Sequence, residues 1–202
     1  MKETKLASVE TMPLPPPAKK GRMSLEETLV RRRSVRGFTR QPLTEQELSQ
    51  LLWALQGITG PAGQRTAPSA GALYPLEIYV LTASGFYHYE PRGHQLSRRS
   101  DHDLRPTVFR ASLEQEAVRE AAAVFVVAAV YGRTAQKYGE ARAPRYVHLE
   151  AGHAAQDLLL EAVALGLGAV LIGAFYDAQV SKALSLPADH EPLYLIPVGH
   201  PR

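Results

Sequence analysis

The sequence predicts an α+β fold in which helices flank a central mixed sheet. The run from Val124 to Val130 is apolar without interruption, as in a strand that is buried on both faces. The leucines between Leu48 and Leu55 are spaced i, i+3, i+4, i+7, the period of an amphipathic helix. Apolar residues in Leu149–Leu165 cover more than one helical face, so this helix needs two partners. We expect it to pack on the sheet and on a second copy of the chain, in a homodimer.

The N-terminal residues 1–23 are polar and rich in proline, a composition that favours a flexible, extended arm. We expect one folded domain over residues 24–202. Ser24-Leu-Glu-Glu27 has the spacing of a capping box and predicts a short helix that ends near Arg32. Thr44-Glu-Gln-Glu47 has the same spacing and begins the leucine-patterned helix, which Gly57 ends.

Turn-forming residues and short apolar runs divide the rest of the chain. In order, we expect a loop over 57–71, a strand over 78–81, a hairpin with strands at 86–89 and 95–96, a helix over 113–122, the central strand, the long helix, a strand over 169–172, a helix over 177–184 capped by Asp177, and a final strand over 193–198. This order of helices and strands is typical of an α+β domain.

The composition excludes several kinds of site. Cysteine is absent, so disulfides, thiolate zinc sites and cysteine nucleophiles are excluded. His148 and His153 are five residues apart and would point to different faces of a helix, so we expect no metal. The longest apolar run, Ala121–Tyr131, is too short to span a bilayer, and no apolar signal segment is present. We therefore expect a cytoplasmic protein that contacts no membrane.

One basic cluster, Arg31-Arg-Arg-Ser-Val-Arg36, follows the first predicted helix. In an extended chain Arg32, Ser34 and Arg36 project to one side, where two guanidinium groups and a hydroxyl suit a phosphate. A solvated basic turn explains the same residues equally well. Nucleic acid is not expected as a partner, because the net charge is only +3 and the cluster has no interleaved aromatic residues.

Three segments together resemble the nitroreductase family of FMN enzymes. They are Arg32-x-Ser34-x-Arg36-x-Phe38, the loop Pro68-Ser-Ala-Gly-Ala-Leu-Tyr-Pro75, and Gly173-Ala-Phe175. Within that family the chain is most similar to the SagB-type dehydrogenases, which include azoline oxidases of thiazole- and oxazole-forming peptide pathways. This similarity rests on the segments Leu51-Leu-Trp-Ala-Leu-Gln-Gly57, Arg65-Thr-Ala-Pro-Ser-Ala-Gly71, Gly85-Phe-Tyr-His-Tyr89, Lys137-Tyr-Gly139, Glu150-Ala-Gly-His153 and Pro197-Val-Gly199.

The resemblance implies a nitroreductase-like dimer that holds FMN between its subunits. The residues it assigns to the phosphate are Arg32, Arg33, Ser34 and Arg36, and those it assigns to the flavin ring, from the second subunit, are Pro68, Ser69, Ala70 and Gly71. Gln115 would contact the pyrimidine edge, although a glutamine on a helix surface is an equal alternative. Gly173 and Ala174 would direct a backbone amide at flavin N5, and the family's glutamate before that amide is replaced by Gly173. Arg202 is the only candidate for a further phosphate ligand beyond the last strand.

Lys137 and Tyr138 match a Lys-Tyr pair that the family's azoline oxidases carry in connection with turnover. Forming an azole removes a hydride from one carbon and a proton from its neighbour, so a base is needed beside the flavin. Either side chain can act as a base when burial or a neighbouring charge activates it. We expect the pair in a polar loop after the central strand, and an inert solvated loop is the alternative.

Three functions follow as hypotheses. The first is oxidation of peptide thiazolines or oxazolines to azoles, with a peptide-modifying protein as a partner. The second is reduction of nitroaromatics or quinones by a nicotinamide donor at the same flavin. The third, from a different class, is a flavin-free module whose arginine cluster binds phosphate or nucleic acid.

Overall fold

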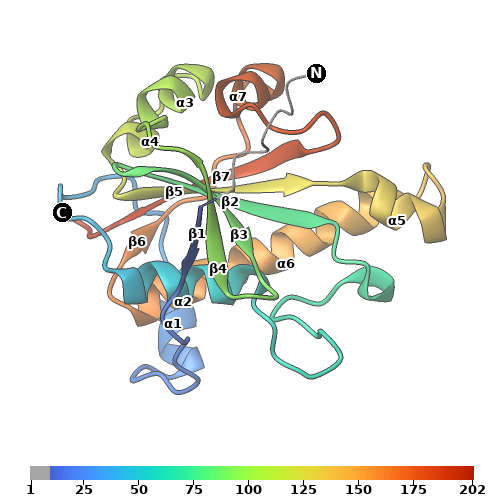
Figure 1. The fold of residues 1–202 in the computed structure, drawn as a ribbon. Helices are drawn as coiled ribbons and strands as arrows, with labels where there is room; N and C mark the ends of the chain where they lie inside the picture. Colours follow the sequence, from blue (N-terminus) through green and yellow to red (C-terminus); the bar gives the residue numbers. More distant parts are fainter. Residues whose placement is uncertain (1–9) are drawn as a thin grey trace.

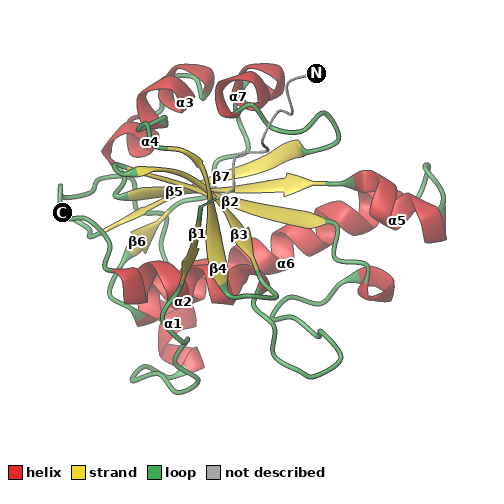
Figure 2. Ribbon diagram, in the orientation of Figure 1, coloured by secondary structure: helices red, strands yellow, loops and turns green. Residues whose placement is uncertain are grey.

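The computed structural model describes residues 10–202, which form a seven-stranded sheet between two layers of helices (Figures 1 and 2). The strands are β1 (Thr11–Pro13), β2 (Leu76–Thr82), β3 (Gly85–Glu90), β4 (Gln95–Ser100), β5 (Ala123–Ala129), β6 (Gly168–Ala169) and β7 (Glu191–Gly199). The α-helices are α1 (Leu25–Arg31), α2 (Glu45–Gln56), α3 (Arg105–Ala111), α4 (Glu116–Glu120), α5 (Tyr131–Tyr138), α6 (Ala143–Ala164) and α7 (Asp177–Leu184), and Ala70–Ala72 form a short 3-10 turn, η1. The predicted α+β fold is confirmed.

The strand order is β1-β4-β3-β2-β5-β7-β6, with β5 in the interior of the sheet as expected. All pairs of named strands are antiparallel. The parallel component expected of a mixed sheet is limited to one isolated bridge between Ser34 and Ala169. This bridge attaches the segment after α1 to the β6 edge.

The two faces of the sheet carry separate cores. Along β5, Phe125 and Val127 pack with α2 and α6, whereas Val124 and Val126 pack with α3, α4 and α7. Every residue of β5 is buried, which explains its uninterrupted apolar sequence. The capping box of α2 has both of its hydrogen bonds. The Thr44 hydroxyl accepts from the Glu47 backbone N–H, and the Glu47 carboxylate accepts from the Thr44 backbone N–H.

The helix expected over 113–122 is wrong at its start. Leu113 and Glu114 adopt left-handed backbone conformations, with φ of 58° and 53°. Residues with a Cβ rarely continue a helix from there, so α3 ends at Ala111 and α4 begins only at Glu116. Helix α6 begins at Ala143, earlier than expected, because a proline in its first turn is compatible with a helix start.

Three smaller expectations also need correction. Lys137 lies in the last turn of α5 and Tyr138 is its final residue, so the pair belongs to a helix and not to a loop. Asp177 is the first residue of α7, whose N-cap is Tyr176. Regular pairing in the strand expected over 169–172 covers only Gly168–Ala169, with one further bridge between Ile172 and Leu195.

The N-terminal segment contacts the domain at several points, although the part of the expected arm over residues 1–9 lies outside the described residues. Strand β1 pairs with β4. Ser49 Oγ in α2 donates to the Pro15 carbonyl over 2.5 Å, and Gln50 exchanges hydrogen bonds with the Ala18 backbone over 2.8 and 3.0 Å. Residues 11–18 therefore form one edge of the sheet and contact the middle of α2.

Candidate active site

One group of the expected site residues lies along the β6 edge of the sheet. Besides the bridge at Ser34, the Val35 N–H donates to the Ala169 carbonyl over 3.0 Å. Five residues after Ala169, the Ala174 carbonyl accepts from Gln115 Nε2 over 2.8 Å. An extended segment of this length spans at most about 17 Å. The arginine cluster and Gln115 therefore flank one short strip of chain.

The basic residues in this group differ in what they contact. Arg33 folds back on the chain, where Nη1 donates to the carbonyls of Val30 and Arg32 over 2.9 and 2.7 Å. Arg36 and Ser34 are exposed, and Arg32 is half-buried. Within residues 10–202 no carboxylate forms an ion pair with Arg32 or Arg36. Two uncompensated guanidinium groups beside a hydroxyl are suited to an anion such as a phosphate.

The amide of Gln115 holds two chain segments together. Its nitrogen donates to the Ser112 carbonyl over 2.9 Å as well as to Ala174. The exposed Gly173 and Ala174 are thereby fixed against the turn that follows α3. A Cβ at Gly173 would meet no atom closer than 3.9 Å, so the space over this strip is open to a ligand.

Arg202 is already engaged within the chain. Its Nε donates to the Phe38 carbonyl over 2.9 Å, and its guanidinium pairs with Glu120 at 2.9 Å. These residues border a cavity of about 860 Å³ that also includes Arg40 and Arg105. Binding of a phosphate by Arg202 requires competition with Glu120.

A second group of expected residues meets at the other end of the molecule. Gly71, in the loop before β2, has φ of +63°. A Cβ placed on it would lie 2.9 Å from Lys137 Nζ and 3.0 Å from Tyr138 Oη. The left-handed conformation favours glycine, and a side chain at this position would displace Lys137 Nζ. The Pro68–Gly71 loop and the Lys-Tyr pair, which are far apart in sequence, are therefore neighbours in one chain.

Helix α6 separates the two groups. It begins shortly after Tyr138, ends shortly before Ala169, and runs beneath the sheet from α5 towards β6 (Figure 1). Its 22 residues correspond to a length of roughly 33 Å. One chain alone therefore presents two distant half-sites.

A buried carboxylate, Glu150, lies behind the loop. Only 2% of Glu150 is exposed, and its Oε1 accepts from Gln56 Nε2 over 3.5 Å. Gln56 in turn accepts from Arg65 Nη1 over 2.8 Å. Burial raises the pKa of Glu150 to about 7, although hydrogen bonds from Ser69 and Gln56 and the charge of Arg65 oppose that rise.

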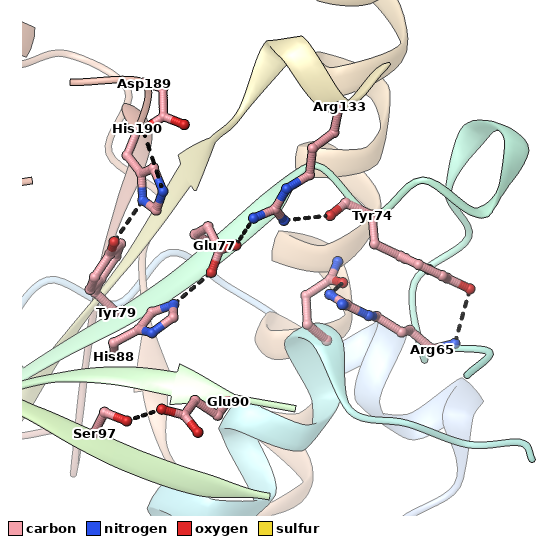
Figure 3. Close-up of polar contacts among 11 residues, drawn as sticks. Arg65, Tyr74, Glu77, Tyr79, His88, Glu90, Ser97, Arg133, Asp189 and His190 are labelled. Atoms are coloured by element: carbon pink, nitrogen blue, oxygen red, sulfur yellow. Dashed lines mark hydrogen bonds and ion pairs between the residues drawn. The ribbon is translucent and has the colours of Figure 1, made fainter. Parts of the chain in front are cut away.

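A second carboxylate, Glu77, lies on the β2 side of the same loop (Figure 3). It accepts hydrogen bonds from Arg133 and from His88, the latter over 2.6 Å. Burial alone would raise the pKa of Glu77, but these two donors and the Arg133 charge outweigh it and lower the pKa to about 2. Arg133 also donates to the Tyr74 carbonyl over 3.1 Å, which ties the ion pair to the loop.

Sequence reasoning did not assign roles to these two carboxylates or to their partners. Arg65 and Glu150 lie in segments that carry the SagB-type resemblance, and that was a usable signal. Glu77 and Arg133 belong to no motif, and only their spatial contact reveals them. In the described part of the chain, no three acidic or histidine side chains gather as metal ligands would. None of the helices within residues 10–202 combines the length and apolarity that a membrane crossing requires.

Similar proteins extend over nearly the whole chain. A protein of Methanocaldococcus jannaschii, itself only provisionally named a nitroreductase, is 44% identical over 183 residues, which cover 88% of this chain and 91% of the relative. The crystal structure of a provisionally named nitroreductase from Ralstonia eutropha JMP134 is 32% identical, with a TM-score of 0.85, covering 95% of this chain and 90% of that one.

Two further structures differ in their described activities. An NADPH:FMN oxidoreductase from Vibrio harveyi, complexed with NAD+, is 27% identical with a TM-score of 0.66, covering 88% of this chain and 68% of that one. A chain of the E. coli microcin synthetase complex with a truncated precursor bound is 21% identical with a TM-score of 0.75, covering 93% and 76%. At that identity the likeness to the synthetase concerns the fold alone. The family model for the nitroreductase family matches residues 29–200, and the chain thus belongs to the nitroreductase family of oxidoreductases.

Proposed function

We propose that this protein is an FMN-dependent homodimeric oxidoreductase of the SagB type, which oxidises peptide thiazolines or oxazolines to azoles. The observation that carries the proposal is the contact of Lys137 Nζ and Tyr138 Oη with the Gly71 position. Desaturation of an azoline needs a proton acceptor beside the flavin, and Lys137 or Tyr138 supplies one at the loop assigned to the flavin ring. Reduction of a nitro group needs no such base.

The β6 edge supplies the contacts for the FMN phosphate. Arg32 and Arg36 provide charge that no carboxylate in the described residues neutralises, and Ser34 provides an exposed hydroxyl. Gly173 and Ala174, held by Gln115, provide an open strip of backbone for the ring. When bound, FMN would supply the hydride acceptor.

The separation of the half-sites supports a homodimer. One flavin cannot contact both ends of a helix roughly 33 Å long, so the Gly71 loop must come from a second copy if both groups serve one ring. Helix α1, beside the arginine cluster, exposes Leu25, Leu29 and Val30 by 60%, 52% and 71%. Such an apolar surface is suited to burial between subunits.

Within this arrangement the chain's own side chains handle the proton. Lys137 is exposed in the single chain, and its Nζ lies 5.5 Å from the centre of the Tyr138 ring. Tyr138 in turn packs on Tyr146 with ring centres 4.7 Å apart. Either Lys137 or Tyr138 would take the proton from the carbon next to the hydride-donating carbon.

A nicotinamide-dependent nitro or quinone reductase is the second candidate. The Vibrio harveyi oxidoreductase and the two relatives named as nitroreductases favour it. It needs the same flavin site but no base at Gly71.

The first test concerns the flavin. Purified protein should be yellow, and Arg32→Ala and Arg36→Ala should each weaken FMN binding by about 1.5 to 3 kcal/mol, or roughly 10- to 150-fold in Kd. Arg31→Ala is the matched control, because Arg31 is in the same cluster but pairs with Glu27 at 2.5 Å. Colourless protein that takes up no added FMN would favour the flavin-free module.

The second test concerns the substrate. Anaerobic addition of an azoline peptide should bleach the bound flavin as the azole forms, whereas NADPH with a nitroaromatic tests the reductase. Lys137→Ala and Tyr138→Phe should retain FMN, and at least one should slow azoline-dependent bleaching by about 10² to 10⁴. Lys182→Ala, an exposed lysine of α7, is the control. Wild-type rates of azoline-dependent bleaching in both variants would show that the pair is not catalytic. Turnover of nitroaromatics alone would contradict azoline oxidation and favour the reductase.

A further inference from the structure

The buried Glu150 is connected to the Gly71 loop through two side chains. Gln56, with 0% exposure, links Glu150 Oε1 to the Arg65 guanidinium over 3.5 and 2.8 Å. Arg65 then contacts Tyr74 in two ways. Its backbone N–H donates to the Tyr74 hydroxyl over 3.3 Å, and its guanidinium lies 4.4 Å from the centre of the Tyr74 ring. A change of charge at Glu150 therefore has a direct route to the loop.

The loop itself is held in an unfavourable conformation. Gly71, Ala72 and Tyr74 have φ of 63°, 55° and 48°, and two of these residues carry a Cβ. The Tyr74 N–H donates to Ser69 Oγ over 2.9 Å, which closes the turn. Such a conformation persists only while surrounding contacts hold it.

We propose that Glu150 is a positioning residue for the Ser69–Tyr74 loop. Its charge acts on the loop through the hydrogen bond to Gln56 and the attraction of Arg65, and so determines where the loop lies relative to Lys137 and Tyr138. Its effect on catalysis rests on the proposed function, whereas its effect on the loop does not. The ionised carboxylate attracts Arg65 and accepts from Gln56 and Ser69. The neutral acid loses that attraction, so the loop is released from one of its supports.

The surroundings of Glu150 make this response specific. Helix α2 presents the uncharged Gln56, the loop presents Ser69, and the segment before the loop presents the cation Arg65. Glu77 and Arg133 act on Arg65 from the β2 side with opposite charges. Because burial places the pKa of Glu150 at about 7, its charge changes near neutral pH.

The test follows the loop amides of the full-length chain by NMR between pH 5.5 and 8.5. In the wild type the Gly71 and Tyr74 amides should shift with a midpoint near the Glu150 pKa of about 7. Glu150→Gln should abolish that shift. The matched control is Glu161→Gln, which changes a half-buried carboxyl of α6 whose partner is Gln50 of α2, away from the loop. In the Glu161→Gln variant the Gly71 and Tyr74 amides should shift with pH as they do in the wild type.

A second readout is the rate against pH on whichever substrate the enzyme turns over. The ratio of the wild-type kcat to the Glu150→Gln kcat should be near one at pH 6 and roughly ten at pH 8.5, with KM changed less. The reason is that a displaced loop misaligns Lys137 and Tyr138, and misaligned reacting groups lower the rate. If Glu150→Gln does not fold, Gln56→Met removes the hydrogen-bonded link between Glu150 and Arg65 and should reduce the amide shift, although the contacts of Glu150 with Ser69 and Arg65 remain.

The outcomes separate the two proposals. Loop amides that do not titrate in the wild type, or that titrate unchanged in both the Glu150 and Gln56 variants, overturn the positioning role. A kcat ratio that does not change with pH overturns the effect of Glu150 on catalysis, and the amide shifts alone decide its effect on the loop. Failure to oxidise azolines leaves the amide result decisive, so it counts only against the proposed function.

Discussion

Glu77 and Glu150 support the same loop from two sides, yet their environments shift the two pKa values in opposite directions. Burial disfavours the charge of both. Glu77 contacts the cation Arg133 directly, and its pKa falls to about 2. Glu150 contacts the neutral amide of Gln56, which lies between it and Arg65, and its pKa rises to about 7. Direct contact with a cation, and not the degree of burial, decides which carboxylate keeps its charge.

The difference gives the two residues different structural roles. Glu77 is ionised throughout the neutral range and acts as a permanent anchor for Arg133, which holds the Tyr74 carbonyl. Glu150 changes charge within that range and acts as an adjustable support. Substitutions at the two carboxylates and at their partners should separate these roles.

Arg133→Met should remove the permanent anchor and cost about 2 to 3 kcal/mol of unfolding free energy at pH 7. Loss of one partner leaves Glu77 as a poorly compensated, largely buried charge, and the partial exposure of Arg133 keeps the cost below that of a fully buried pair. Urea unfolding measures the change. Arg31→Met, which breaks an exposed ion pair with Glu27, should cost less than about 1 kcal/mol. Equal losses would show that the Glu77 pair is no stronger than a surface pair.

Glu150→Gln should change how stability depends on pH. An acid whose pKa is raised from 4.5 to about 7 on folding contributes stability that is complete below pH 4.5 and lost as the pH rises through 7. The variant lacks this loss, so its unfolding free energy relative to wild type should rise by about 2 to 3 kcal/mol between pH 5 and pH 8. Glu116→Gln, a surface change, should show no such trend. A constant difference across this range would place the Glu150 pKa elsewhere.

His88→Phe should have the smallest effect, about 1 kcal/mol at pH 7, because it removes one of two hydrogen bonds to Glu77. Phenylalanine can retain the packing on Tyr79, whose ring centre lies 4.7 Å from that of His88. The lowered pKa of Glu77 contributes stability that is present above pH 4.5 and lost as the pH falls towards 2. With one donor fewer, acid unfolding should begin at a higher pH. An unchanged acid midpoint would mean that Arg133 alone sets the Glu77 charge.

Local features of the sequence determined much of the fold. The apolar run of β5, the leucine spacing of α2 and the capping box at Thr44 each produced the element they predicted. These signals work because side-chain period and helix capping depend on residues only a few positions apart. The arginine cluster, the Pro68–Pro75 loop and Gly173-Ala-Phe175 likewise indicated the nitroreductase family before any spatial information was available.

Tertiary structure alone decided how distant residues meet. The left-handed turn at Leu113 and Glu114 divides a segment that reads locally as one helix. Gly71 meets Lys137 because β2, α5 and α6 fix both segments at one end of the sheet, and Glu150 lies behind them because its face of α6 packs on α2. The charge of a buried carboxylate depends on such long-range neighbours, and no local pattern records them.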